Sequence, residues 1–246
     1  DQANSLIEAA IANKHTASNP DTWYTAGKIQ EKIYNKENEK MYLQQAYDQA
    51  KFFGSLSKMF DYFLICDSLE QIPDEKGKVI AKYRPEMTEL LSRIRINLVS
   101  GGVTYFNEGN DAKAFDLFSQ YIDVADAPLP AADNWMETDT LLHEIAYYAT
   151  LAGLKMEDYN KALKYVDLAM NKPENAQKAI EYKAMSYLNL GDTINWLNTL
   201  KVGVEKFPAV QYFYSNLISY YNTNGNTADL MAFADEMLAK NPLPIF

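Results

Sequence analysis

A short phrase recurs four times in this chain: a tyrosine followed four or five residues later by a glycine. The glycines of the four copies are 44, 38 and 34 residues apart, at Gly109, Gly153, Gly191 and Gly225. A proline follows each of the last three copies, at Pro173, Pro208 and Pro242. A period near 34 residues with an aromatic residue, a glycine and a closing proline is typical of stacked helix–turn–helix units. We therefore expect an all-α chain forming an α-solenoid, with an extended curved surface that binds a ligand.

The charge balance disfavours two classes of partner. The chain has 23 Lys and Arg against 33 Asp and Glu, a net charge of −10. Nucleic acids and anionic membranes both attract basic patches, and here the charges are scattered along the sequence. No apolar stretch approaches the roughly 18 residues of a membrane-spanning helix. We expect a solvated acidic surface, no nucleic-acid binding and no insertion into a membrane.

The N-terminal part shows helical periodicity in irregular units. Apolar residues at helical spacing predict a helix over 1–11, and Pro20 after Asn19 predicts the start of a helix that runs to about Tyr34. A charged loop is expected at 35–40, followed by helices over 43–53 and 56–71 and a break at 72–77. Pro85 then opens a helix predicted over 86–107. We expect residues 1–75 to form irregular repeats and 76–100 to be a long connecting helix region.

The pattern is clearer over 95–246, where we expect four repeats within a single domain spanning 1–246. One helix ends at Gly109, where a left-handed cap favours glycine, and its partner starts at Asp111. A loop at 127–130 stops that partner. The remaining helices are expected in pairs: 138–152 with 157–170, 175–190 with 192–206, and 209–223 with 227–240. No segment shows the alternation of a strand bounded by hairpin turns.

The repeats resemble the tetratricopeptide repeat. In the unit aligned on Gly109, the matching small, tyrosine, alanine and aromatic positions are Gly102, Tyr105, Ala114 and Phe118. In the unit aligned on Gly191 they are Ala184, Tyr187, Trp196 and Leu200. The unit around Gly153 carries an insertion of about four residues. The resemblance implies a right-handed superhelix, in which the small residues allow helices to approach closely.

A second likeness bears on location. The segment Asn19-Pro-Asp-Thr-Trp-Tyr-Thr-Ala-Gly27 resembles exported bacterial proteins built of such repeats. It implies a periplasmic or otherwise exported protein, and a cytoplasmic location stays open.

No pattern of catalytic or metal-binding residues is present in the sequence. The chain has two histidines, His15 and His143, and one cysteine, Cys66, with no metal-ligand spacing among them. Leu142-His-Glu-Ile-Ala146 begins like a zinc-protease motif, but Tyr147 stands where the second histidine is required. There is no phosphate-binding glycine loop or nucleophile elbow. We expect no enzyme activity, no cofactor and no metal, and we interpret Cys66 as a buried thiol.

The resemblance also implies where a ligand lies, because first helices line the concave face in this family. A protein or peptide is the expected partner. The alternative is a helical glycan-binding accessory protein of a bacterial cell envelope, in which aromatic rings stack on sugars. The aromatic residues of this face could also fill gaps between repeats. The predicted concave residues are Tyr24, Lys28, Phe106, His143, Tyr147, Glu181, Met185, Tyr212, Ser215 and Asn222.

Overall fold

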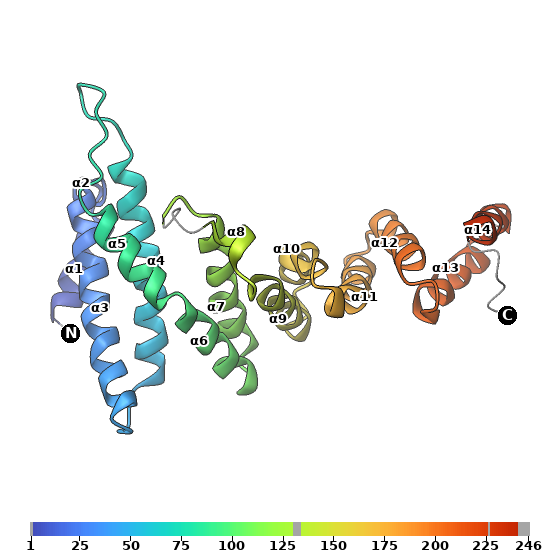
Figure 1. Cartoon of the computed structure of the whole chain (residues 1–246), viewed down its shortest axis with the longest axis horizontal. Helices are drawn as coiled ribbons and strands as arrows, with labels where there is room; N and C mark the ends of the chain where they lie inside the picture. The colour runs from blue at the N-terminus through green and yellow to red at the C-terminus, as the bar shows by residue number, and fades with distance from the viewer. Residues whose placement is uncertain (1, 130–133, 226, 241–246) are drawn as a thin grey trace. The chain divides into compact units, whose positions relative to one another are not determined.

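The computed structural model describes residues 2–129, 134–225 and 227–240, and over these residues the protein is helical without a strand. This confirms the all-α prediction. The chain divides into two compact units, unit 1 (residues 1–140) and unit 2 (residues 141–246) (Figure 1). The single domain over 1–246, the solenoid and its right-handed superhelix stay predictions.

Unit 1 is built around two long antiparallel helices, α3 and α4, which pack along each other (Figure 1). The short helices α1 and α2 pack on α3, and a second helical hairpin, α6 with α7, follows along the chain. The elements are α1 (Gln2–Ala12), α2 (Lys14–Ala17), α3 (Pro20–Tyr42), α4 (Gln49–Glu70), α5 (Arg84–Ile94), α6 (Ile96–Asn107), α7 (Asp111–Asp123), the 3-10 turn η1 (Val124–Asp126) and α8 (Trp135–Thr138).

Helix α3 starts where the sequence predicted and ends later. Asn19 caps it by accepting a hydrogen bond from the N–H of Asp21, and Pro20 occupies the first turn. The loop predicted at 35–40 is wrong, because these residues continue α3 to Tyr42. The physical reason is Glu37, which is buried and accepts hydrogen bonds from Lys40 and from the N–H of Asp48 (2.8 Å). The charged residues 35–40 are therefore helical, and the carboxylate of Glu37 anchors the backbone at Asp48, at the end of the following turn.

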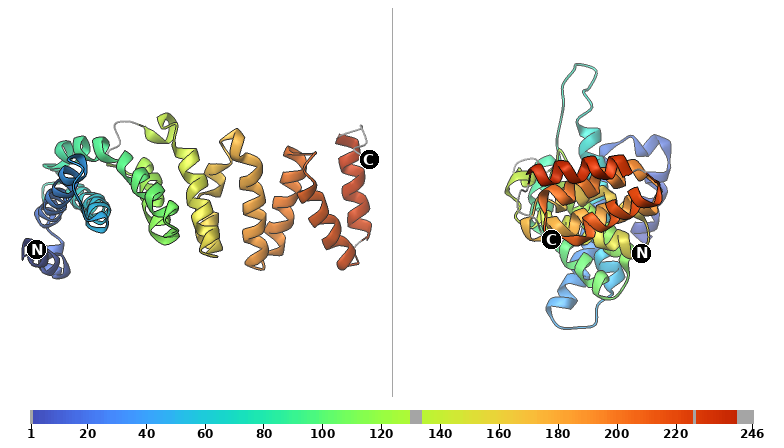
Figure 2. Two further views of the ribbon diagram at one scale, coloured as in Figure 1. Left: turned by 90° about the horizontal axis from the view of Figure 1, so that it is seen from below. Right: turned by 90° about the vertical axis from the view of Figure 1, so that its right-hand side faces the viewer.

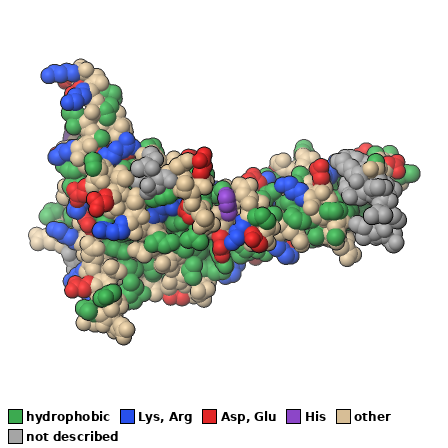
Figure 3. All heavy atoms as spheres, viewed as in Figure 1, with side chains coloured by type: hydrophobic (Ala, Val, Ile, Leu, Met, Phe, Trp, Pro, Cys, Tyr) green, Lys and Arg blue, Asp and Glu red, His purple; other side chains and the backbone are tan. Residues whose placement is uncertain are grey.

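The two helices predicted over 43–53 and 56–71 are one helix, α4. The chain reverses at 43–48, where Gln44 takes a left-handed conformation (φ 56°) and Asp48 caps the new helix. No glycine marks this turn, so it has no local signal in the sequence. The predicted break at 72–77 is confirmed: a loop over 71–83 projects from unit 1 (Figure 1), with lysines exposed at its tip (Figure 3).

The helix predicted over 86–107 is divided at Arg95 into α5 and α6. The Arg95 side chain is buried, and its guanidinium lies 3.7 Å from the centre of the Tyr121 ring and 4.2 Å from that of Trp135. It forms an ion pair with Asp139 (2.7 Å) and donates to the backbone carbonyl of Tyr121. These contacts attach the segment containing α8 to the hairpin of α6 and α7.

The described residues of unit 2 form six helices, each of which packs against the next, as Figure 2 shows. They are α9 (Leu142–Lys155), α10 (Tyr159–Ala169), α11 (Pro173–Asn189), α12 (Thr193–Lys206), α13 (Gln211–Thr223) and α14 (Thr227–Lys240). The pairs expected for this part are present, but the first helix starts at Leu142 rather than at 138. The buried core of α11 to α13 comprises Ile180, Ala184, Trp196, Leu200, Val204, Phe213, Leu217 and Tyr221. Asp1, Pro130 and Pro242, which entered the sequence predictions, lie outside the described residues.

The same turn closes three hairpins. Gly109 and Gly191 are left-handed (φ 74° and 72°), as expected for glycine caps, and the residue after each caps the next helix. In the hairpin of α9 and α10 the left-handed residue is Glu157, four residues beyond Gly153. The insertion predicted there is therefore the last turn of α9. Gly153 instead allows close packing, since a Cβ at this position would lie 2.5 Å from the backbone nitrogen of Ala162.

Candidate functional site

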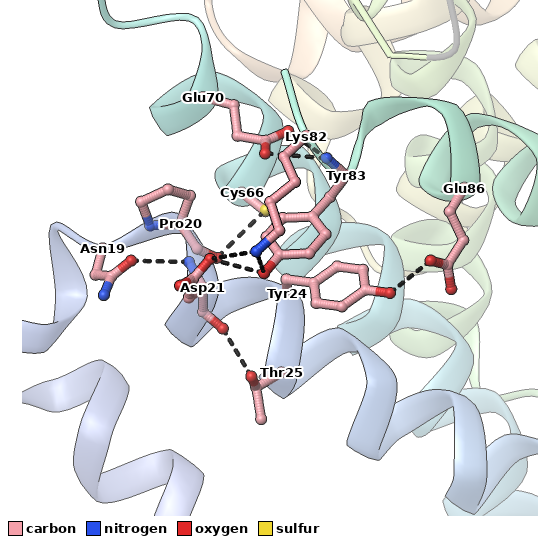
Figure 4. Close-up of polar contacts among 10 residues, drawn as sticks. All are labelled: Asn19, Pro20, Asp21, Tyr24, Thr25, Cys66, Glu70, Lys82, Tyr83 and Glu86. Atoms are coloured by element: carbon pink, nitrogen blue, oxygen red, sulfur yellow. Dashed lines mark hydrogen bonds and ion pairs between the residues drawn. The ribbon is translucent and has the colours of Figure 1, made fainter. Parts of the chain in front are cut away.

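The two candidates on α3 take part in contacts within unit 1. The hydroxyl of Tyr24 donates to Glu86 (2.6 Å), and its ring stacks on that of Tyr83, with centroids 3.7 Å apart and planes at 9° (Figure 4). Burial and the hydrogen bond to Glu86 raise the pKa of Tyr24 to about 12. Lys28 pairs with Glu86 (2.9 Å) and with Glu31. Desolvation opposes the charge of Lys28, but these two carboxylates raise its pKa overall.

This cluster fixes the base of the loop over 71–83. The Tyr83 hydroxyl donates to Asp21 (2.7 Å), and its backbone N–H donates to both oxygens of Glu70 (Figure 4). Lys82 lies 3.6 Å from Asp21. The Tyr24 ring thus holds α3 to the end of the loop, and the polar groups of Tyr24 and Lys28 hold it to α5, which is a structural use for both residues.

Phe106, the remaining candidate in unit 1, lies half-buried on α6. Its ring centroid is 6.4 Å from that of Phe118 on α7, in a tilted arrangement. The same Phe118 ring covers Gly102, because a Cβ at Gly102 would lie 2.3 Å from it. Phe106 therefore contributes to the packing of its own hairpin.

In unit 2 the structure brings tyrosines from two first helices together. The rings of Tyr147 on α9 and Tyr182 on α11 have centroids 5.9 Å apart and planes at 37°, and their hydroxyl oxygens are 3.5 Å apart. Tyr148 meets the Tyr147 ring edge-on, at 6.1 Å. All three side chains are half-buried, so part of each ring area faces solvent.

The residue before Tyr182 on α11 is a carboxylate whose charge acts on two of the predicted tyrosines. Glu181 on α11 accepts hydrogen bonds from the side chains of Gln177 (2.9 Å) and Lys178 (2.7 Å), and only 13% of its side chain is exposed. Burial and the hydrogen bond with Tyr182 raise the pKa of Tyr147, with a further contribution from the Glu181 charge. Burial and the same charge raise the pKa of Tyr212 on α13. Glu181 therefore acts on tyrosines from the helices on both sides.

We call the set Tyr147, Glu181, Tyr182 and Tyr212 the tyrosine–carboxylate surface. It joins α9, α11 and α13, the first helices of three consecutive hairpins. Three of its members were predicted from the sequence. Tyr182 was missed, as were Gln177 and Lys178, although Lys178 and Gln177 lie three and four residues before Glu181, a spacing that could have indicated them.

The other predicted residues lie on the same three helices. His143 precedes Tyr147 by one turn and Met185 follows Glu181 by one turn, and both are half-buried. Ser215 and Asn222 are exposed on α13. Their contribution to a common site stays a prediction.

Cys66 is buried, as predicted, with its sulfur 3.3 Å from the carbonyl oxygen of Pro20. Burial raises the pKa of this thiol to about 12, so it stays protonated at neutral pH. Among the described residues, no three His, Cys, Asp or Glu side chains are grouped so that they could hold a metal ion. None of the helices in the described part of the chain combines the length and the apolar character needed to cross a membrane.

A shallow hollow of about 170 Å³ lies on the other side of α11, between it, α12 and the end of α10. Lys183, Asn195, Asn198 and Thr199 line it together with aliphatic residues, and Tyr187 is the one aromatic residue of its lining. Lys183 is paired with Asp167 on α10 (2.6 Å).

Comparison with known proteins gave no match: no family model, no curated protein and no solved structure is significantly similar to this chain.

Proposed function

We propose that this protein is a non-enzymatic binding protein with a tetratricopeptide-like solenoid architecture, and that unit 2 presents the tyrosine–carboxylate surface to a protein or peptide. The supporting observations are the ring contact between Tyr147 on α9 and Tyr182 on α11, and the charge of Glu181 on α11, which contributes to the raised pKa values of Tyr147 and of Tyr212 on α13. First helices are the elements that the family resemblance assigns to the ligand.

The physical properties of the surface suit a peptide. Half-buried tyrosines offer large contact areas with little side-chain entropy to lose, and such residues are frequent at the energetic centres of interfaces. Their positions are fixed, since Tyr147 packs on Tyr182 and Glu181 is held by two hydrogen bonds. A surface that is already ordered binds with a smaller ordering cost.

The ring geometry favours a peptide over a sugar. A glycan site should present aromatic faces side by side in one pocket. Here Tyr147 is tilted against Tyr182 and meets Tyr148 edge-on, and the hollow beside α12 has Tyr187 as its one aromatic residue. Glycan binding is therefore the competing outcome of the test.

The test starts with selection of displayed random peptides on the purified chain, followed by calorimetry of the selected peptides. Tyr147→Ala and Tyr212→Ala should each weaken binding by about 2 kcal/mol. Tyr159→Ala is the matched control, because Tyr159 is a half-buried tyrosine on the second helix α10 and should leave affinity unchanged. Thermal melting of each variant separates lost binding from lost stability.

Two results would contradict the proposal. One is selected peptides that bind equally well to Tyr147→Ala and Tyr212→Ala. The other is a glycan array on which the chain binds sugars through Tyr147 while no peptide is selected.

A further inference from the structure

We propose that the tyrosine–carboxylate surface recognises an arginine side chain of its peptide ligand, with Glu181 as the partner of the guanidinium and the rings of Tyr147 and Tyr182 as its stacking neighbours. This inference rests on the proposed function and specifies the chemistry of the same surface.

The first argument is the combination of a carboxylate with aromatic rings. The faces of tyrosine rings carry partial negative charge and attract cations within about 6 Å. Glu181 directly precedes Tyr182 on α11, its charge contributes to the raised pKa of Tyr147, and its small exposure keeps it less screened than a free surface carboxylate. Helix α13, which carries Tyr212, has no charged side chain. Such a surface suits a cation.

The second argument is that the cation already present is weakly held. Lys178 pairs with Glu181 across one helical turn, and 54% of its side chain is exposed. Exposed pairs of this kind contribute about 0.2–1 kcal/mol. Lys178 and Gln177 each take one carboxylate oxygen, and a carboxylate can accept about four hydrogen bonds. An incoming guanidinium can therefore displace Lys178 while Gln177 keeps Glu181 in place.

The third argument distinguishes arginine from lysine. A guanidinium is planar, so it can stack on a tyrosine ring and donate two parallel hydrogen bonds to a carboxylate, whereas an ammonium is a compact and strongly hydrated charge. Within unit 1 the Arg95 guanidinium likewise lies over the Tyr121 ring and donates to the Asp139 carboxylate through one nitrogen, while its other donors bind the Tyr121 carbonyl. Glu144 on α9 is already paired with Lys172, the residue before α11 (2.7 Å).

The experiment is an NMR titration of the whole chain, with labelled tyrosine rings, against N-acetyl-arginine methylamide. The lysine analogue and the citrulline analogue, a neutral molecule of nearly the same shape as arginine, are titrated in parallel. Arginine should shift the ring signals of Tyr147 and Tyr182 to saturation. Citrulline should bind about tenfold more weakly and lysine several-fold more weakly, because charge-assisted and bidentate hydrogen bonds are lost.

Two variants give effects of opposite sign. Glu181→Gln should weaken arginine binding about tenfold, since the charged acceptor is removed. Lys178→Ala should strengthen it about two- to fivefold, because the competing cation is gone. A merely structural Lys178 would not produce tighter binding. Asp167→Asn is the matched control, since Asp167 is also paired with a lysine but lies on α10, and it should change nothing.

Equal affinities for arginine and citrulline, or weaker arginine binding by Lys178→Ala, would overturn the inference. If selected peptides bind through Tyr147 and Tyr212 without any preference for arginine, this inference fails and the proposed function stands. If no peptide binds at this surface, both fail.

Discussion

The two units of this protein use the same kind of turn, a left-handed residue followed by a capping residue, which in unit 1 occurs at Gly109–Asn110. They differ in the other contacts that tie their helices together. In unit 2, a left-handed residue and a capping aspartate join α9 to α10 and α11 to α12, at Glu157–Asp158 and Gly191–Asp192. In unit 1, polar contacts between residues far apart in the sequence tie the long helices to one another. The Tyr24 hydroxyl donates a hydrogen bond to Glu86, and the side-chain amide of Gln120 on α7 donates one to Asp61 on α4 (2.7 Å).

The difference bears on function. In unit 2, Tyr147, Glu181 and Tyr212 lie on successive first helices, and the Glu181 charge contributes to the raised pKa values of both tyrosines. The long-range contacts of unit 1 use tyrosine and charged groups for its own stability, as at Tyr24 and Lys28. The same residue types thus form a candidate binding surface in unit 2 and internal contacts in unit 1.

The largest expected effect tests the long-range contacts of unit 1. Arg95→Met leaves the carboxylate of Asp139 buried without its cation, and removing one partner of a buried pair costs about 3–5 kcal/mol. Hydrogen exchange should show this loss in α6 and α7. The control is Lys183→Met, which breaks the more exposed pair with Asp167 in unit 2 and should cost less than about 1 kcal/mol. Equal losses of unfolding free energy in Arg95→Met and Lys183→Met would show that the buried pair contributes no more to stability than the exposed pair.

The next effect should be similar in both units. A Cβ at Gly102 would lie 2.3 Å from the ring of Phe118, and one at Gly203 would lie 2.3 Å from the ring of Phe213. Gly102→Ala and Gly203→Ala should therefore each lower the free energy of unfolding by about 1–3 kcal/mol through overpacking. Gly54→Ala is the control, because a Cβ there would meet no atom of another element within 4 Å, and it should stabilise α4 by about 0.5–1 kcal/mol. Denaturant midpoints measure the stability of all three variants. Unchanged midpoints for Gly102→Ala and Gly203→Ala would show that a methyl group fits at these two positions.

Smaller changes in stability, opposite in sign, are expected at Glu157 and Gly191, the left-handed residues of two turns in unit 2. Glu157 is left-handed at φ 56°, a conformation that costs a non-glycine residue about 1–2 kcal/mol. Glu157→Gly should raise the stability of unit 2 by up to about 1 kcal/mol, because the loss of chain entropy on folding offsets part of the relief. Gly191→Ala should lower stability by a similar amount. The two melting temperatures should move in opposite directions, and movement in the same direction would contradict a common turn.

The smallest effect depends on pH. The hydrogen bonds from Lys40 and from the N–H of Asp48 lower the pKa of Glu37. A lowered folded-state pKa stabilises the protein above the unfolded value of about 4.3, and this stabilisation is lost as the pH falls through the folded pKa. Glu37→Gln should therefore be less stable than the native chain at neutral pH, with the difference disappearing in acid. Urea unfolding at a series of pH values measures it, and a difference that persists in acid would exclude the ionised carboxylate as its origin.

Sequence reasoning succeeded where the determining signal is local. Pro20 with Asn19, and the left-handed Gly109 and Gly191, mark helix ends through the backbone preferences of single residues. It failed where a turn lacks a glycine or where a helix end depends on residues that are distant in the sequence. Gln44 turns the chain without glycine, and the division at Arg95 coincides with contacts to Tyr121 and Asp139 that no local pattern indicates.

For the candidate surface, too, the sequence predicted what the repeat period determines and missed what depends on packing between helices. The repeat period predicted Tyr147, Glu181 and Tyr212 as residues of successive first helices. It did not predict that Tyr24 would stack on Tyr83, because the two residues are separated by the whole of α4 and the loop that follows it. Nor did it predict the ring contact between Tyr147 and Tyr182, which depends on how α9 and α11 pack.

Hydrogen–deuterium exchange of the whole chain, with and without a display-selected peptide, tests the central claim most directly. We predict slower exchange in α9, α11 and α13, with exchange unchanged in α10, α12 and the loop over 71–83. Protection confined to α10 and α12, or to unit 1, would contradict the assignment of the binding surface to the first helices of unit 2.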